Sequence, residues 1–301
     1  MAGIPSPPAL DQPAQLFSSL LYSRALLTQD ENTRICGGQP APLYMLVYHR
    51  DRILQAARNF TWHAAIDALQ QPECISQLRE KCQQAVDDAL AMSDSSSVQS
   101  GEQAFRLRIL ITRTACITVQ AVRIPAISVA GLFPSFLPPP PPPSPPPSDA
   151  TATTTPAWSV HLDTQATPPS SLTRYKTTSR DHYDDARARV GITAFAEPRE
   201  VLLWSPDGWV MEGSITNVYF WRAERGGWIT PSTPQDGGAD GDDAGGMGGT
   251  VRRWLLEKGI VTVGDVRKEE VRDGEAVWLS NGVKGVVFGR IVAANARREG
   301  A

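Results

Sequence analysis

The sequence contains few cysteines, and they are not spaced for a metal site or a disulfide framework. Its four cysteines are far apart and form no CxxC pair. Its four histidines form neither an HExxH motif nor a zinc-finger pattern. We therefore expect no bound structural metal and no disulfide framework.

An excess of positive charge and a long apolar run are also missing. The 29 Lys and Arg residues face 32 Asp and Glu residues, which gives a formal net charge of −3, and this balance argues against nucleic acid as a partner. No apolar run reaches the ~18 residues that span a membrane. The start, MAGIPSPPALDQPAQ, lacks the basic and apolar regions of a secretory signal. We expect a cytoplasmic protein that makes no membrane contact.

Proline and glycine are ordinary in number outside two short tracts. Ten of the 25 prolines lie between Pro134 and Pro147, and nine of the 24 glycines lie between Gly226 and Gly249. Proline fixes φ and lacks the N–H group, so the first tract cannot form helix or sheet and marks a domain boundary. The remaining composition is that of a globular protein.

The hydrophobic pattern predicts two α+β domains joined by the proline-rich segment. The expected divisions are a disordered N-terminus (1–15), a small α+β domain (16–127), an interdomain linker (128–157), a larger α+β domain (158–293) and a tail (294–301).

Periodicity also predicts individual elements. In the first domain we expect a short apolar β-type run from Leu43, helices at about 51–60, 63–69 and 75–92, and strands at 106–112 and 117–124. In the second we expect strands at 160–162, 228–230, 269–271, 276–280 and 286–291, a helix at about 179–190, a flexible loop at 235–249 and a helix from near Thr250. The segment EVLLWS-PDG-WVMEGSITNVYFW predicts a hairpin whose second strand runs on to Trp221.

Lys176 is the first candidate for chemistry. It lies in TRYKTTSRDHYDDAR, just before the expected helix, and Lys176, Arg180, Tyr183 and Arg187 recur on one helical face. A desolvated lysine on a rigid element has a lowered pKa and can act as a Schiff-base nucleophile. A lone lysine is more often solvated on the surface.

A second group of polar residues lies in MEGSITNVYF. Glu212, within the expected strand, is a carboxylate that could keep a pyridine nitrogen protonated. Ser214, Thr216 and Asn217 could supply hydroxyl and amide hydrogen bonds. Taken alone, each is equally typical of a half-exposed strand.

Three segments could bind a phosphate group. Glycines precede a helix start in GMGGTVRRW, where free N–H groups and the helix dipole favour an anion. The turn SNGVKG offers a second set of amides, and Arg52 in YHRDRILQAA offers a guanidinium.

These motifs occur in the order HxDR, KTxxR, EGSxTN, GTxR and SNGV. In this order they resemble the fold-type IV pyridoxal-phosphate (PLP) enzymes, the class IV aminotransferase family. The similarity runs from about residue 16 to residue 291. Within the family the sequence is similar to the fungal-type 4-amino-4-deoxychorismate lyase-like proteins, through LFSSLLY, YHRDR and VWLSNGV.

The resemblance assigns roles to the candidate residues. It implies that Lys176 holds PLP as a Schiff base and moves the proton, and that Glu212 binds the pyridine nitrogen, with Ser214, Thr216 and Asn217 beside it. It implies a phosphate site made by Arg52, Gly249, Thr250, Val251, Gly282 and Val283. It also implies a two-domain α+β fold, with the cofactor in the interdomain cleft, and a homodimer.

Three functions remain open from the sequence. The first is a PLP-dependent lyase that converts 4-amino-4-deoxychorismate to 4-aminobenzoate and pyruvate, a step toward folate. The second is a transaminase of the branched-chain or D-amino-acid type on the same fold. The third is a non-catalytic binding protein whose Pro138–Pro147 tract contacts SH3- or WW-type domains.

Overall fold

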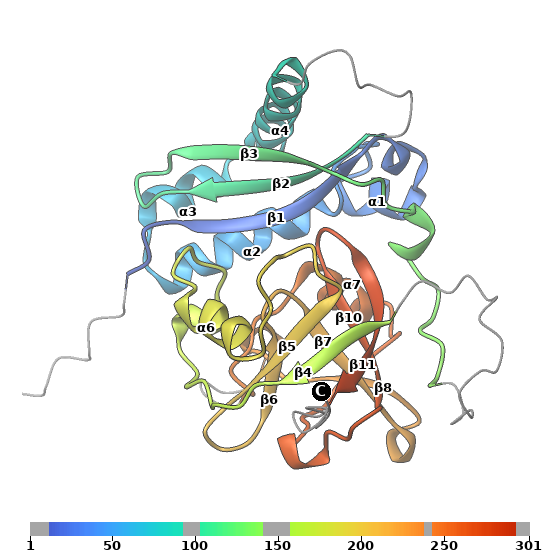
Figure 1. Ribbon diagram of the computed structural model, residues 1–301. Helices are drawn as coiled ribbons and strands as arrows, with labels where there is room; N and C mark the ends of the chain where they lie inside the picture. Colours follow the sequence, from blue (N-terminus) through green and yellow to red (C-terminus); the bar gives the residue numbers. More distant parts are fainter. Residues whose placement is uncertain (1–11, 93–102, 141–156, 238–242, 293–301) are drawn as a thin grey trace, which may run out of the picture.

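The computed structural model describes residues 12–92, 103–140, 157–237 and 243–292, and it contains two β-sheets (Figure 1). The first sheet is antiparallel and has the strand order β1-β2-β3. The second has eight strands in the order β6-β5-β4-β11-β10-β7-β8-β9. Every strand of the first sheet precedes residue 125, and every strand of the second follows residue 157.

The first half of the chain packs helices on one face of its sheet. Alternate residues of β2, such as Phe105 and Leu107, are buried against the helices, whereas Arg106 and Arg108 point to the other face. This alternation directs two cationic side chains toward the second half of the molecule. The elements are β1 (Leu16–Ser23), α1 (Asp30–Ile35), α2 (Leu46–Asn59), α3 (His63–Gln70), α4 (Cys74–Ala91), β2 (Ala104–Ile111) and β3 (Ile117–Ile124).

The second half is built around the eight-stranded sheet. Its strands are β4 (Trp158–Leu162), β5 (Arg199–Trp204), β6 (Val210–Gly213), β7 (Asn217–Arg222), β8 (Gly227–Thr230), β9 (Thr262–Val263), β10 (Ala276–Asn281) and β11 (Gly285–Val292). Its helices are α5 (Ser171–Arg174), α6 (Asp181–Arg189) and α7 (Thr250–Glu257). Among the described residues, no helix is long and apolar enough to cross a bilayer.

A shared apolar core joins the two halves. Leu21 and Tyr44 from the first half pack in one buried cluster with Tyr219 and Trp254 from the second. The described part of the linker belongs to this contact, because the Trp228 indole N–H donates to the carbonyls of residues 137 and 138. The remaining linker prolines, which lie at 141–143, 145–147 and 156, are outside the described residues.

Several sequence predictions are confirmed. The amphipathic helices α3 and α4 and the strand β3 agree with the expected ranges to within one residue. The hairpin of β5 and β6 forms as expected, with its bend at the PDG turn. The helix expected near Thr250 begins at Thr250.

The second strand of this hairpin is not continuous, so that prediction was wrong. It breaks at 214–216, and the two pieces, β6 and β7, occupy well separated positions in the strand order of the sheet. The break has a physical cause: the buried carboxylate of Glu200 accepts hydrogen bonds from the backbone N–H groups of Ser214 and Ile215. The Ser214 N–H also keeps a ladder hydrogen bond to the Val201 carbonyl at 3.0 Å, whereas the Ile215 N–H donates to Glu200 and leaves the ladder.

Two further predictions of strands were also wrong. In addition, the strands β1 and β9 were not predicted from the sequence. The run from Leu43 is not a strand: α2 begins at Leu46, and Leu43 makes only an isolated bridge to Tyr22. An apolar run in a helix buried on several sides cannot be told from a strand by periodicity. Residues 268–270 form a 3₁₀ turn rather than a strand.

Candidate active site

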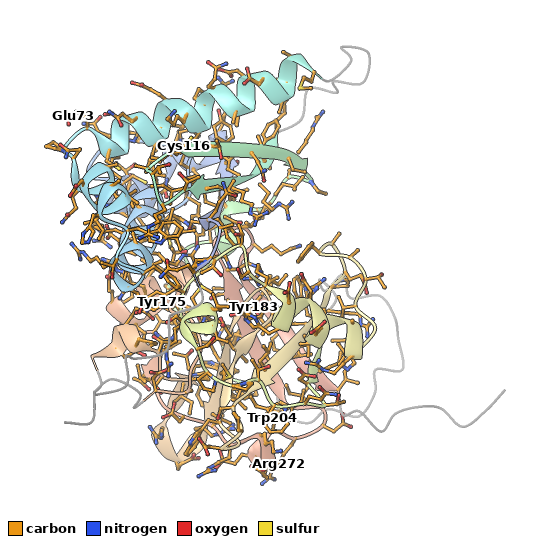
Figure 2. All side chains as sticks on the ribbon, turned by 90° about the vertical axis from the view of Figure 1, so that its left-hand side faces the viewer. Glu73, Cys116, Tyr175, Tyr183, Trp204 and Arg272 are labelled. Atoms are coloured by element: carbon orange, nitrogen blue, oxygen red, sulfur yellow. The ribbon has the colours of Figure 1, made fainter. Side chains whose placement is uncertain are left out.

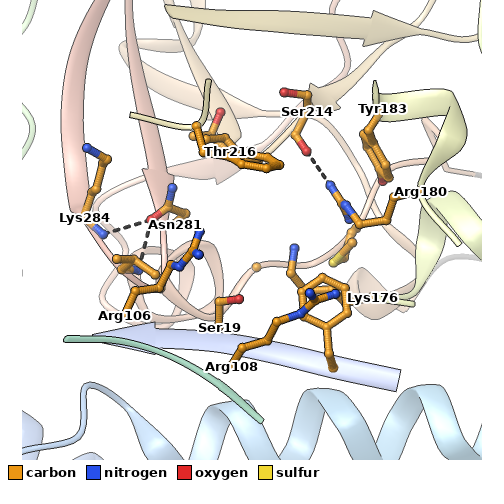
Figure 3. A pocket seen from close by; sticks show the side chains of 18 of the residues that line it. Ser19, Arg106, Arg108, Lys176, Arg180, Tyr183, Ser214, Thr216, Asn281 and Lys284 are labelled. Atoms are coloured by element: carbon orange, nitrogen blue, oxygen red, sulfur yellow. Dashed lines mark hydrogen bonds between the residues drawn. The ribbon is translucent and has the colours of Figure 1, made fainter. Parts of the chain in front are cut away.

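A cavity of about 430 Å³ lies where the two halves meet. Residues of β1 and β2 line one side, and the segment around Lys176, the end of β6 and the turn after β10 line the other. Figure 3 shows Arg106 and Arg108 reaching into this cavity from below, opposite Arg180 and Thr216. The cavity therefore collects candidate residues that are far apart in sequence.

Lys176 lies between α5 and α6 and is fixed by β1. The Phe17 N–H donates to the Lys176 carbonyl at 3.1 Å, and Leu16 bridges to Thr177. The Lys176 ammonium nitrogen lies 5.1 Å from the centre of the Phe17 ring. Burial, with the nearby charges of Arg180 and Arg52, holds the pKa of Lys176 well below its usual value. A lysine with a lowered pKa loses its proton more readily, and its neutral amine can act as a nucleophile or a base.

Glu212, at the end of β6, is a buried carboxylate facing the same cavity. The Tyr183 hydroxyl donates to its Oε1 atom at 2.5 Å. Burial raises the pKa of Glu212 to about 7, although the Tyr183 hydrogen bond and Lys176 act in the opposite direction. The site thus holds one acid and one base whose ordinary pKa values are shifted toward each other.

Ser214 and Thr216 line the cavity, but their hydroxyl protons are donated to Glu200. Asn217 donates its side-chain amide to the Met247 carbonyl at 2.7 Å. These three residues, expected to hydrogen-bond a cofactor, thus hold the loops around Glu212. Sequence reasoning missed Glu200, because nothing in EVLLW distinguishes a buried glutamate from an exposed one.

The start of α7 forms an open set of amides. Gly249 is the N-cap and no side chain caps the helix, so the first-turn N–H groups of Thr250 and Val251 have no intrahelical acceptor. Gly249 packs closely on Asn217: a Cβ atom there would lie 2.1 Å from Asn217 Oδ1. A glycine is therefore required at this position by space, and the amides can receive an anion.

Arg52 borders the cavity near these amides. Its Nη2 atom donates to Ser18 Oγ at 2.5 Å, and its buried Nε atom has no protein partner. A buried guanidinium N–H without an acceptor is costly and indicates an absent anionic partner. This unpaired donor fits the phosphate role that the resemblance implies.

The turn after β10 fits that role only in part. Gly282 borders the cavity and packs on the His49 ring, where a Cβ atom would lie 2.5 Å from Cε1. The Val283 N–H, however, donates to Asn281 Oδ1 at 2.9 Å. The amide of Val283 is therefore engaged within the turn, which contradicts the expectation that it is open to a phosphate.

His49 belongs to this site and was not predicted. It is fully buried, with Nδ1 2.7 Å from Ser18 Oγ and Nε2 3.4 Å from Thr250 Oγ1. Burial and the charge of Arg52 hold the pKa of His49 well below its usual value, so the ring is neutral. It links α2, β1 and α7 around the proposed anion site. Its place in YHRDR, one helical turn before Arg52, was the available indication.

Arg106 and Arg108 were also missed, although their spacing of two in a strand places both on one face. The Arg108 guanidinium lies 4.1 Å from the centre of the Phe17 ring. Together with Arg180 they make the cavity strongly cationic. No cluster of three metal-binding side chains occurs in the described parts of the chain.

The chain belongs to the class IV aminotransferase family, whose sequence profile matches residues 31–291. It is 28% identical over 203 residues to the aminodeoxychorismate lyase of Saccharomyces cerevisiae. That match covers 63% of this chain and 52% of the yeast protein. It is 33% identical over 120 residues to a Schizosaccharomyces pombe protein provisionally named for the same activity. That match covers 39% of this chain and 47% of the Schizosaccharomyces pombe protein. The chain spans about half the length of these curated relatives.

Solved structures establish the fold. A hypothetical aminotransferase of Mycobacterium tuberculosis in its PLP-bound form matches with a TM-score of 0.54 and 16% identity. The match covers 98% of this chain and 88% of that one. The prediction of an α+β fold of the fold-type IV class is therefore confirmed.

Proposed function

We propose that the cavity binds PLP, with Lys176 as the attachment residue. The supporting observation is the arrangement in one cavity of a half-buried lysine, a buried carboxylate and an arginine whose buried N–H lacks an acceptor. Arg52 and the amides of Thr250 and Val251 would hold the phosphate, and Glu212 would hold the ring nitrogen. The turn at Gly282 would contribute to the phosphate site through its close packing on the His49 ring.

The crowding at Gly249 makes the phosphate part of this proposal testable. Gly249→Ala is expected to weaken PLP binding about tenfold or more, because the new methyl group must push the α7 amides away from Asn217. The Kd is measured by titrating PLP and following protein fluorescence. Gly227→Ala is the control, since nothing lies within 4 Å of its Cβ position. A Kd for Gly249→Ala within twofold of wild type would contradict the assignment.

We propose further that the protein is a lyase that converts 4-amino-4-deoxychorismate to 4-aminobenzoate and pyruvate. Bound PLP would supply an electron-withdrawing ring that stabilises negative charge on the substrate carbon. Lys176, whose pKa is lowered, would remove the proton from that carbon and later return it. Arg106, Arg108 and Arg180 would bind the carboxylates of this acidic substrate and orient it. The yeast relatives support this choice of substrate.

A product assay tests the lyase proposal. Purified protein with PLP and aminodeoxychorismate is expected to release 4-aminobenzoate and pyruvate in equal amounts, measured by chromatography and a coupled pyruvate assay. Amino transfer to a 2-oxo acid without 4-aminobenzoate would overturn the proposal in favour of a transaminase. A protein that binds no PLP, even when PLP is added, would favour a non-catalytic role.

We also propose a homodimer, supported by the family to which the chain belongs. Sedimentation velocity at micromolar concentration distinguishes a dimer from a monomer, and a single species of about 33 kDa would contradict the proposal.

A further inference from the structure

Tyr183 is fully buried on α6, and its two parts make different contacts. Its ring packs in an apolar cluster with Ala186, Val201 and Met211. Its hydroxyl lies 2.5 Å from Glu212 Oε1 and 3.2 Å from the Thr173 carbonyl. Figure 2 shows Tyr183 at the level where the two halves of the molecule meet, and Figure 3 shows it at the edge of the cavity.

The geometry of the hydroxyl favours Glu212 as its acceptor. A phenol has one proton to donate, and the shorter contact, to a carboxylate oxygen, is the one typical of a charge-assisted hydrogen bond. The contact joins residues 29 positions apart, so it depends on the packing of α6 against the β5–β6 hairpin.

We propose that Tyr183 is a positioning residue that acts through Glu212: its hydrogen bond fixes Oε1 and keeps this buried carboxylate charged and oriented toward the ring nitrogen of the cofactor. The orientation toward a cofactor rests on the proposed function. The hydrogen bond and its effect on the charge of Glu212 do not, so the two can be tested separately.

Several groups face Glu212, and they act in opposite directions. The Tyr183 hydroxyl and the Arg180 guanidinium face it from α6 and its N-cap, and Lys176 faces it from the preceding segment. Arg52 interacts with it from α2, and the backbone at Met247 also hydrogen-bonds it. Burial is the largest effect and raises the pKa of Glu212, whereas the Tyr183 hydrogen bond is the largest effect that lowers it. Loss of that bond should therefore favour the protonated acid.

Tyr183→Phe removes the hydroxyl and leaves the ring in its apolar cluster. We expect the Glu212 titration midpoint to rise by about one to two pH units, the usual effect of a hydrogen bond to a charged group. The measurement is infrared difference spectroscopy of the PLP-free full-length chain between pH 5 and 10, after circular dichroism has verified the fold. The carboxyl band of Glu212 is assigned by its loss in Glu212→Gln.

Tyr44→Phe is the matched control. Tyr44 is equally buried and donates its hydroxyl to the Leu132 carbonyl, in the apolar core that joins the two halves rather than at Glu212. The Tyr44→Phe variant should be less stable than wild type, but its Glu212 titration midpoint should be unchanged. An unchanged midpoint in Tyr183→Phe, within about 0.3 pH units, overturns the proposal whether or not the protein binds PLP.

A measurement without a substitution covers the case in which Tyr183→Phe fails to fold. Protein labelled with 3-fluorotyrosine has a more acidic phenol, which is a stronger donor, so the Glu212 midpoint should move down. An unmoved midpoint again overturns the proposal.

In the PLP-bound enzyme, the kcat of Tyr183→Phe should recover as the pH rises and Glu212 ionises, while the KM stays constant. A pH-independent loss of kcat would indicate a purely structural role and contradict the proposal.

Discussion

Replacing Lys176 with alanine is expected to abolish the visible absorbance of bound PLP and to lower kcat by at least about 10³-fold. The reason is that Lys176 lines the cavity together with Glu212 and Arg52, and that desolvation lowers its pKa. Lys284, another amine at the cavity, lies over the Trp158 ring. Lys284 is therefore held at another place and is not expected to replace Lys176. An absorbance spectrum and a product assay on the same sample provide the measurement.

Lys268→Ala is a suitable control for this substitution. Lys268 is a partly exposed lysine whose ammonium group lies on the Trp204 ring, away from the cavity. Its removal should leave both spectrum and turnover near those of wild type. If Lys176→Ala kept the PLP band, or retained activity within about tenfold of wild type, Lys176 would not be the attachment residue.

The second large effect is expected at Glu212, where function and stability should change in opposite directions. Glu212→Gln is expected to lower kcat by about 10²–10³-fold, as for other preorganised charges in active sites. The same change should raise the free energy of unfolding of the PLP-free protein by about 2–3 kcal/mol at pH 8. The neutral amide avoids the cost of burying a charge while still accepting the Tyr183 hydrogen bond.

The sign of this effect follows from the pKa. Burial raises the pKa of Glu212 from 4.5 to about 7, so the folded protein binds this proton more tightly than the unfolded chain. Stability is therefore lost as the pH rises from 4.5 to 7, and the whole penalty is present above pH 7. Urea unfolding at pH 4 and pH 8 measures it, and the gain from Glu212→Gln should be present only at pH 8.

Glu269→Gln provides the comparison, because the Glu269 side chain is 64% exposed. It should change neither kcat nor the pH dependence of unfolding. An equal stability change for Glu212→Gln at both pH values would mean that packing, rather than the buried charge, causes it. An unchanged kcat would remove Glu212 from the proposed mechanism.

Elements with a strong local pattern could be predicted from the sequence. Helices α3 and α4 repeat apolar residues at helical spacing, and the PDG turn between alternating strands specifies the hairpin of β5 and β6. The motif residues Lys176, Arg52 and Glu212 were also found, and the structure places all three in one cavity.

The predictions that failed depended on hydrogen bonds that form only in the folded chain. The strand after Gly213 breaks where Glu200, 15 residues earlier than Ile215, accepts the backbone N–H of Ile215. The Val283 amide is engaged by Asn281 within a turn whose geometry the motif SNGV did not specify. Local sequence does not encode which of two possible acceptors a buried amide will meet.

The sequence by itself determined which chemical groups are present and in what order, and that order was enough to place the chain in its family. Only the tertiary structure decided their chemical state. Lys176 has a lowered pKa because β1 and the cations Arg180 and Arg52 surround it, and Glu212 has a raised pKa because it is removed from water. Desolvation and long-range hydrogen bonds such as that of Tyr183 exist only once the two halves have packed together.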